Sequence, residues 1–222
     1  MTTTTLSPLE QARFNMIEQQ IRPWNVLDTQ VLELLSEVKR EDFVPVAHKS
    51  LAFGDFELTL GHGASMLAPK VEARLLQDLK LTGTENVLEI GTGSGYMAAL
   101  LARQSHHVTT LEINPELAAM AVQNLAHAVI ANVDVRVQDG SKVDAIVGEF
   151  DVIVLSGSVA KIPETLTAKL KVGGRLVAIV GGEPVMRMTL VSRTSSGLQT
   201  IQPWDTLAPR LTGFAENDKF TF

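Results

Sequence analysis

The sequence predicts a doubly wound α/β domain with a mostly parallel, seven-stranded sheet and a helical N-terminal extension. From Asn86 onward, short apolar runs alternate with helical segments of about 10–15 residues, which is the pattern of βαβ units. The runs are rich in Val, Ile and Leu without polar alternation, as expected of strands that are covered on both faces. Residues 7–80 differ, because they read as helices joined by loops.

Three helices are expected in this N-terminal part. The first spans Pro8–Arg22, the second follows Asp28 as its N-cap, and the third begins at Pro69. An irregular stretch, punctuated by Gly and Pro, runs from Phe43 to Ala68. The apolar faces of the helices are expected to carry Phe14, Ile17, Ile21, Val31, Leu32, Leu35, Val38, Val71, Leu75, Leu76 and Leu79.

The sheet follows in the remaining residues. Its expected strands are Val87–Ile90, His107–Leu111, Val133–Val137, Phe150–Leu155, Arg175–Val180, Met188–Arg193 and a last, antiparallel one within residues 210–222. The helices between them are expected at Gly95–Gln104, Pro115–Ala128 and Pro163–Leu170. Parallel strands need such crossover helices, so the helices should cover the sheet.

Composition excludes several classes of function. The 222 residues carry 19 Lys and Arg against 25 Asp and Glu, a net charge of −6. No basic run exceeds Lys39-Arg40, which disfavours nucleic acid as a partner. The chain has no cysteine, so disulfides, thiolate nucleophiles and zinc–cysteine sites are excluded. The five histidines lack the spacing of metal ligands, and no metal is expected.

The sequence shows no sign of a membrane or secretory segment. The start, Met1–Leu6, lacks the basic and apolar regions of a signal peptide. No stretch approaches the roughly 18–20 apolar residues that a spanning helix needs. A soluble, cytoplasmic protein is therefore expected.

A glycine-rich loop after the first strand of the sheet is the strongest motif. It reads E-I-G-T-G-S-G-Y over Glu89–Tyr96. Gly91 and Gly93 allow a tight turn and a close approach of a ligand to the backbone. The loop ends at a helix N-terminus, which favours a negatively charged group. Such a loop is a weak signal alone, but its position between a strand and a helix strengthens it.

The ligand that this pattern favours contains adenosine. The dinucleotide fingerprint needs a third glycine at position 96, where this chain has Tyr96, and this weakens a nicotinamide or flavin interpretation. Glu112 stands 21 positions after Gly91, at a strand end where a carboxylate can accept hydrogen bonds from ribose hydroxyls. Asp139-Gly140 follows the next strand and suits the adenine side. A purely structural turn, with a solvated Glu112, is the alternative.

The glycine loop resembles the first motif of class I S-adenosylmethionine-dependent methyltransferases. It is especially similar to the protein-L-isoaspartate O-methyltransferase family. Further blocks that resemble this family are Met16–Arg22, Glu41–Pro45, Ile162–Glu164, Gly173–Val177 and Ala208–Leu211. The resemblance implies a Rossmann-like methyltransferase fold, with residues 1–80 as extension and substrate loop and residues 81–222 as the cofactor-binding core of one globular unit.

The resemblance also implies a site for S-adenosylmethionine, with S-adenosylhomocysteine as the product. The cofactor-binding residues would be Glu89, Ile90, Gly91, Thr92, Gly93, Ser94 and Gly95 at the methionine end, Glu112 and Ile113 at the ribose, Asp139 and Gly140 at the adenine, and Ser156. Ser65 would be the catalytic residue, beside the transferred methyl group and the acceptor. The acceptor would be a peptide or protein carboxylate, in a reaction that begins protein repair.

One position departs from the family in the loop before Pro69. The family usually reads Gly-x-Thr-Ile-Ser-x-Pro there, whereas residues 63–69 read Gly-Ala-Ser-Met-Leu-Ala-Pro. Leu67 thus replaces a serine that the family uses beside the substrate, and isoaspartyl activity is expected to be weakened. A divergent methyltransferase with another acceptor, or a cofactor-binding protein without catalysis, are the alternatives.

Overall fold

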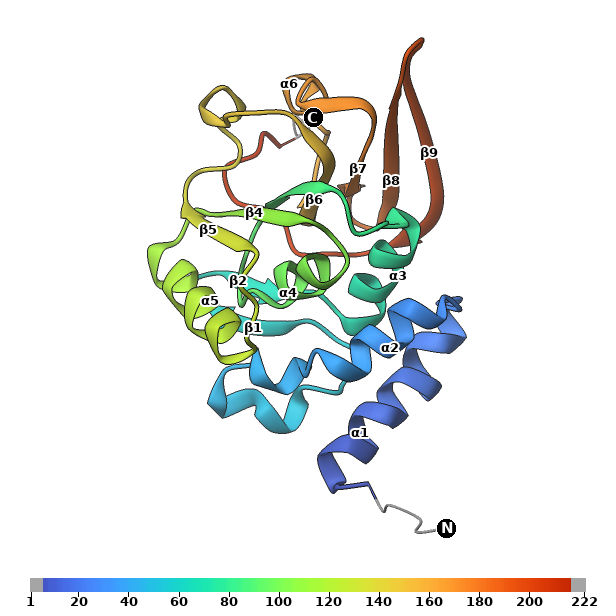
Figure 1. Ribbon diagram of the computed structural model, residues 1–222, viewed down its shortest axis with the longest axis vertical. Coiled ribbons are helices and arrows are strands. Elements are labelled where there is room, and N and C mark those ends of the chain that lie inside the picture. Colours follow the sequence, from blue (N-terminus) through green and yellow to red (C-terminus); the bar gives the residue numbers. More distant parts are fainter. Residues whose placement is uncertain (1–5, 217–222) are drawn as a thin grey trace, which may run out of the picture.

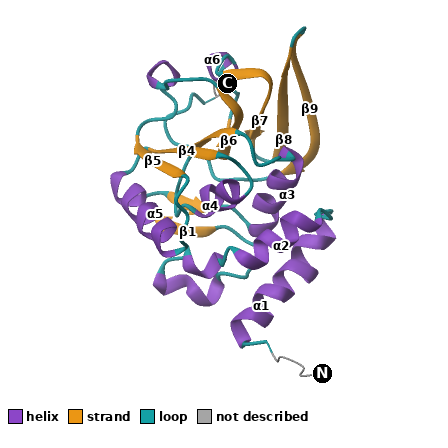
Figure 2. Ribbon diagram, in the orientation of Figure 1, coloured by secondary structure: helices purple, strands orange, loops and turns teal. Residues whose placement is uncertain are grey.

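The computed structural model describes residues 6–216. In this range a seven-stranded sheet has the order β5-β4-β3-β6-β7-β8-β9, with helices on both faces (Figures 1 and 2). The strands are β3 (Asn86–Ile90), β4 (His107–Glu112), β5 (Val133–Val137), β6 (Phe150–Val159), β7 (Leu170–Gly182), β8 (Val185–Thr194) and β9 (Gly197–Thr206). Strands β3 to β7 pair in parallel, whereas β8 and β9 pair antiparallel. The predicted fold class is confirmed.

The prediction of the last strand was wrong. It placed the strand within residues 210–222, but the final strand is β9, which forms a long hairpin with β8 (Figure 1). In residues 210–216 only an isolated bridge from Arg210 to Ser158 is found, and residues 217–222 lie outside the described range. Strand β9 is exposed along most of its length at the sheet edge, so it lacks the apolar pattern by which strands are recognised.

Helices α4 (Tyr96–Arg103), α5 (Pro115–His127) and α6 (Glu164–Thr167) connect the strands. Side chains that alternate along a strand enter two separate cores. Val152 and Val154 of β6 pack into the larger core with the N-terminal helices, whereas Ile153 and Leu155 pack into the smaller core around α6. The N-terminal extension therefore serves as the cover of one sheet face.

The first predicted helix is interrupted. α1 (Pro8–Met16) continues as a π-helical turn (Ile17–Ile21) and a 3₁₀ turn (Arg22–Trp24), so a single helix over Pro8–Arg22 was wrong. The π turn takes one extra residue per hydrogen-bonded ring and rotates the following residues. Ile17 and Ile21 are consequently buried, while Phe14, which was expected on the same face, is 51 % exposed.

The other two helices form as predicted. α2 (Thr29–Glu37) begins at Asp28, whose carboxylate accepts a hydrogen bond from the Gln30 N–H at 2.9 Å. α3 (Pro69–Leu79) begins at Pro69. The stretch before it is less irregular than expected, because β1 (Leu58–Gly61) and β2 (Ala64–Met66) form a small antiparallel pair.

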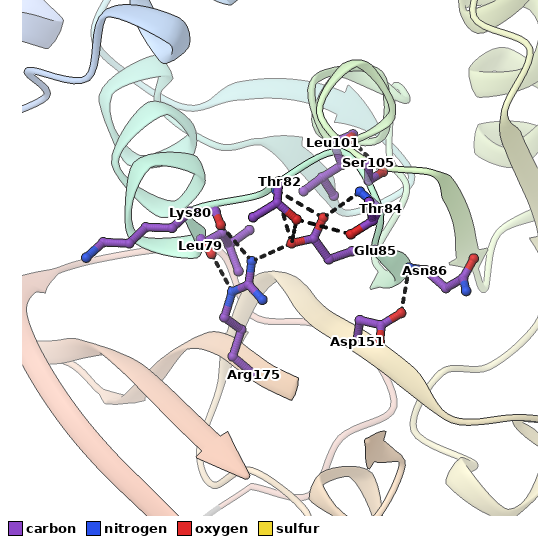
Figure 3. A network of polar contacts seen from close by, with 10 residues as sticks. All are labelled: Leu79, Lys80, Thr82, Thr84, Glu85, Asn86, Leu101, Ser105, Asp151 and Arg175. Carbon is purple, nitrogen blue, oxygen red and sulfur yellow. Dashed lines mark hydrogen bonds and ion pairs between the residues drawn. The ribbon is translucent and has the colours of Figure 1, made fainter. Parts of the chain in front are cut away.

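A polar network joins the end of α3 to the sheet (Figure 3). Arg175 of β7 donates to the backbone oxygens of Leu79 and Lys80 and to the Glu85 carboxylate. Glu85 also accepts hydrogen bonds from the backbone N–H groups of Thr82 and Thr84, just before β3. These bonds fix α3, and the loop that precedes it, relative to the strands that carry the glycine loop. Within residues 6–216, no helix is long and apolar enough to cross a bilayer.

Candidate functional site

A cavity lies at the carboxyl ends of β3 and β4. Strand β3 pairs with β4 on one side and β6 on the other, so the strand order reverses there, and open α/β sheets bind ligands at this point. The empty space of this cavity, together with the open solvent at its entrance, is about 620 Å³. It is lined by Gly63, Ala64, Ser65, Ile90, Gly91, Gly93, Leu111, Glu112, Ile113, Gln138, Gly140, Ser156, Pro209, Arg210, Leu211 and Thr212.

The glycine loop forms one wall. Gly91, Gly93 and Gly95 have φ angles of 95°, 53° and 85°, which side chains rarely tolerate. A Cβ atom at Gly91 would lie 2.6 Å from Cδ2 of Leu211, so the glycine also permits a close approach of the C-terminal segment. The loop then leads into α4, as the sequence predicted.

Glu112 lies across the mouth of this loop. Its Oε2 accepts a hydrogen bond from the Gly93 N–H at 2.8 Å, and its Oε1 accepts one from the Asn114 N–H at 3.0 Å. A carboxylate offers about four acceptor positions, so acceptor capacity remains for a ligand. Ile113, 42 % exposed, presents an apolar surface beside it. A sugar with an attached flat, apolar ring suits this pair.

Glu89 does not line the cavity. It is fully buried, and it accepts hydrogen bonds from Ser156 Oγ at 2.6 Å and Thr110 Oγ1 at 2.7 Å. Burial raises the pKa of Glu89 to about 7, against the lowering effect of these two hydroxyls. The carboxyl group therefore holds Ser156, which does line the cavity, from behind the loop.

Asp139 is also turned away from the cavity. Its Oδ1 accepts hydrogen bonds from the backbone N–H and the hydroxyl of Ser141, and these bonds lower the pKa of Asp139. Its neighbour Gly140 lines the cavity and packs on Ile90, where a Cβ would lie 2.3 Å from Cγ2. Gln138, which the sequence did not single out, lies there too, and its buried Nε2 has no acceptor among the described residues.

Ser65 connects this cavity to a smaller one behind it. The smaller cavity is lined by Leu60, Ser65, Met66, Leu67, Glu72, Gly91, Thr92, Gly93, Ser94, Tyr96, Met97 and Ser156. Ser65 lies on β2, opposite Thr59 of β1. Leu67 is 3 % exposed and contributes an apolar wall. Of the predicted residues, Glu89, Gly95 and Asp139 thus line neither cavity, and the others line at least one.

The C-terminal segment 209–212 is, besides Gln138, a part of the cavity that sequence reasoning missed. Ser158 donates its N–H to the Pro209 oxygen at 2.7 Å, and its own oxygen accepts from the Leu211 N–H at 2.9 Å. These bonds dock the segment on β6 beside the glycine loop. The signal was present, because Ala208–Leu211 resembles a family block, but the strand expected from residue 210 concealed it.

A family profile described as protein-L-isoaspartate(D-aspartate) O-methyltransferase (PCMT) matches residues 11–206. The chain belongs to this family. It is 40 % identical over 184 residues to protein-L-isoaspartate O-methyltransferase 1 of Rhodopseudomonas palustris strain HaA2, covering 82 % of this chain and 75 % of the relative. It is 38 % identical over 190 residues to the protein of the same name from Syntrophobacter fumaroxidans, covering 86 % of this chain and 89 % of that relative.

Solved structures of PCMT proteins have the same fold. A protein-L-isoaspartate O-methyltransferase structure superposes with a TM-score of 0.76 at 23 % identity, over 94 % of this chain and 67 % of that one. A Plasmodium falciparum structure, solved in complex with S-adenosyl-L-homocysteine, gives 0.74 at 19 % identity, over 92 % and 99 %. PCMT membership confirms the expected enzyme class, a carboxyl O-methyltransferase that uses S-adenosylmethionine.

Proposed function

We propose that this PCMT protein methylates isoaspartyl residues of peptides and proteins in the cavity at the ends of β3 and β4. One observation carries the proposal. Ser65 lines the same cavity as the glycine loop and Glu112, although it comes from a different part of the chain. A methyltransferase needs this arrangement, because the acceptor must meet the cofactor at one point.

The residues present fit the cofactor. Glu112 would bind the ribose hydroxyls, and Gly140, Ile113 and the unpaired amide of Gln138 would accommodate the adenine ring. Gly91, Gly93 and Gly95 carry no Cβ atom of their own, so the methionine end of the cofactor could approach the loop backbone closely. When bound, S-adenosylmethionine supplies a methyl group that is activated by the attached sulfonium.

The chain's own contribution is orientation of the acceptor. A carboxylate with a pKa near 4 is ionised at pH 7, so no general base is needed. Ser65 lines both cavities, and its hydroxyl can donate a hydrogen bond to a carboxylate oxygen of the acceptor. Orientation of the reacting groups can contribute up to roughly 7–11 kcal/mol.

The decisive experiment measures transfer of a radiolabelled methyl group from S-adenosylmethionine to an isoaspartyl peptide. The same peptide with a normal aspartyl residue is the control. We expect labelling of the isoaspartyl peptide only, and micromolar binding of S-adenosylmethionine and S-adenosylhomocysteine by calorimetry, with weaker binding of NAD. Tight NAD binding without any response to S-adenosylmethionine would refute the assignment.

Leu67 supports a second candidate, a methyltransferase for another acceptor. Its buried side chain stands in the inner cavity where the family has a hydroxyl. This candidate would be favoured if the protein binds the cofactor and methylates other added carboxylates, but does not methylate isoaspartyl peptides or itself. The expected cytoplasmic location stays a prediction.

A further inference from the structure

An open groove lies beside the cofactor cavity. It encloses about 1120 Å³, open solvent included. Its walls come from the end of the N-terminal helices, the loop before β1, the start of α3, the β7–β8 turn and the end of β9. The lining residues are Trp24, Asp55, Phe56, Glu57, Ala68, Lys70, Val71, Pro184, Val185, Asp205, Thr206 and Leu207.

Two chain segments lead from the groove to the methyl-transfer site. Along residues 65–68, Ser65 lines both inner cavities and Ala68 lines the groove. Three residues span at most about 10 Å. Residues 205–207 likewise line the groove, and residues 209–212 line the cofactor cavity. The groove thus continues from the place where an acceptor carboxylate would lie, and polypeptide flanking the acceptor has a path along it.

The charges in the groove are predominantly negative. Asp55, Glu57 and Asp205 face one lysine, Lys70. Lys70 is already engaged, because it pairs with Asp55 at 2.8 Å and stands over the Trp24 ring, 3.9 Å from its centroid. Negative charge therefore remains after the internal ion pair is counted.

Glu57 is the carboxylate that is left over. No Lys, Arg or His of the described residues lies within ion-pair distance of it, and partial loss of hydration raises the pKa of Glu57. Asp205 pairs with Arg187 at 3.3 Å, but both side chains are more than half exposed, where such pairs are weak. Glu57 and Asp205 can therefore each form an ion pair with a cationic group of a ligand.

Apolar side chains lie between these charges. Phe56, Val185 and Leu207 line the groove and are each close to half exposed. Lysine and arginine carry long apolar stems with a charged end, so they match a surface that is apolar between carboxylates. An acidic side chain would meet like charges there instead.

We propose that this groove binds the polypeptide next to the acceptor residue, and that Glu57 and Asp205 select substrates with a lysine or arginine at that place. The proposal rests on the proposed function, since the acceptor defines where the flanking chain begins. It adds a specificity that comes from this chain's own carboxylates.

The test compares isoaspartyl peptides that differ at one flanking position. Two series place Lys, Gln or Glu two residues before or two residues after the isoaspartyl residue, and kcat/KM is measured for each. We expect the Lys peptide to exceed the Glu peptide by about two- to fivefold per charge contact in at least one series, mostly through KM. The preference should shrink at high salt, because exposed charges are screened.

Variants assign the preference to the groove. Glu57→Gln should reduce the ratio between Lys and Glu peptides, and Glu57→Gln with Asp205→Asn should abolish it. Glu149→Gln, which removes an exposed carboxylate outside the groove, should leave the ratio unchanged. Equal kcat/KM for all peptides, or equal effects of Glu57→Gln and Glu149→Gln, would overturn the proposal.

Binding separates this proposal from the proposed function. If no isoaspartyl peptide is methylated, the proposed function fails, and fluorescence anisotropy of labelled peptides in the presence of S-adenosylhomocysteine still tests the groove. Tighter binding of the Lys peptide, lost in Glu57→Gln, supports it. If Glu57→Gln changes the sedimentation coefficient of the protein but not its peptide preference, the groove is a contact between two copies of the chain. That outcome would overturn the proposal.

Discussion

Arg40 donates a hydrogen bond from Nη2 to the backbone oxygen of Leu67 at 2.8 Å, across 27 residues of sequence. The same guanidinium pairs with Glu72 of α3 and donates to the Ala52 oxygen. The loop that carries Ser65 and Leu67 is therefore held by a fully buried cation, not only by its own turn. The backbone of this loop is fixed whatever side chain stands at position 67.

Leu67→Ser is the first prediction. A restored hydroxyl should raise kcat/KM for an isoaspartyl peptide by about ten- to a hundredfold, because a hydrogen bond to a charged group contributes roughly 1.5–3 kcal/mol. Truncation of this buried leucine should also lower stability by about 2–5 kcal/mol. Leu34→Ser, in a buried position of α2, is the control that loses stability without gaining activity. Wild-type turnover that is robust and unimproved would show that the hydroxyl is dispensable.

Glu112→Ala should weaken S-adenosylmethionine binding by about ten- to a hundredfold. It removes an acceptor whose hydrogen bonds are worth roughly 1.5–3 kcal/mol. Isothermal calorimetry measures the change, and circular dichroism checks that the variant folds. Glu33→Ala, at an exposed position of α2, should bind normally. Unchanged affinity in a folded Glu112→Ala protein would remove this residue from the site.

Arg40→Met should destabilise the protein by about 3–5 kcal/mol, since it leaves the buried Glu72 without its partner. It also removes the donor to the Leu67 oxygen, so kcat should fall more than cofactor affinity. Urea unfolding gives the first quantity and steady-state kinetics the second. Arg103→Met, at an exposed site on α4, should change neither. Equal effects of the two substitutions would contradict the positioning role.

The raised pKa of Glu89 predicts how stability depends on pH. An unfolded glutamate titrates near 4.5 and the folded one near 7, so between these values the folded protein binds more protons than the unfolded one. The free energy of unfolding should therefore fall as pH rises from about 4.5 to 7. Glu89→Gln should reduce this slope in urea titrations at several pH values. An identical slope would show that Glu89 has the same pKa in the folded and the unfolded protein.

The same carboxyl group should make cofactor binding depend on pH. With a pKa of about 7, Glu89 is roughly 10 % ionised at pH 6 and 90 % at pH 8. The ionised carboxylate behind the glycine loop should attract the positively charged sulfonium, so S-adenosylmethionine affinity should rise by at most about tenfold between these pH values. The product lacks the sulfonium charge, so its affinity should rise less. Glu89→Gln is the control, because the ligands' own titration is the same with both proteins. Equal pH profiles for the two proteins would exclude Glu89 as the cause.

The sequence by itself determined most of the strands and helices of the sheet domain, and the glycine loop. Periodicity and the strand–loop–helix context are local, so Val87–Ile90, the loop through Gly95 and the Pro69 helix could be predicted from neighbouring residues. The spacing after Gly91 singled out Glu112, the resemblance to the family singled out Ser65, and both residues line the cavity. Phe14 was misjudged because a π turn, which no local pattern announced, changed the helix register.

Only the tertiary structure decided which groups face the cavity. Glu89 is turned away because Thr110 of β4 and Ser156 of β6 donate hydrogen bonds to its oxygens. Asp139 differs, because it accepts its hydrogen bonds from Ser141, only two residues further along the same turn. The entry of residues 209–212 into the cavity depends on hydrogen bonds of Ser158 with Pro209, 51 residues away in sequence, and with Leu211. Contacts between distant segments leave no periodic mark in the chain, and they are formed only when the sheet brings the strand ends together.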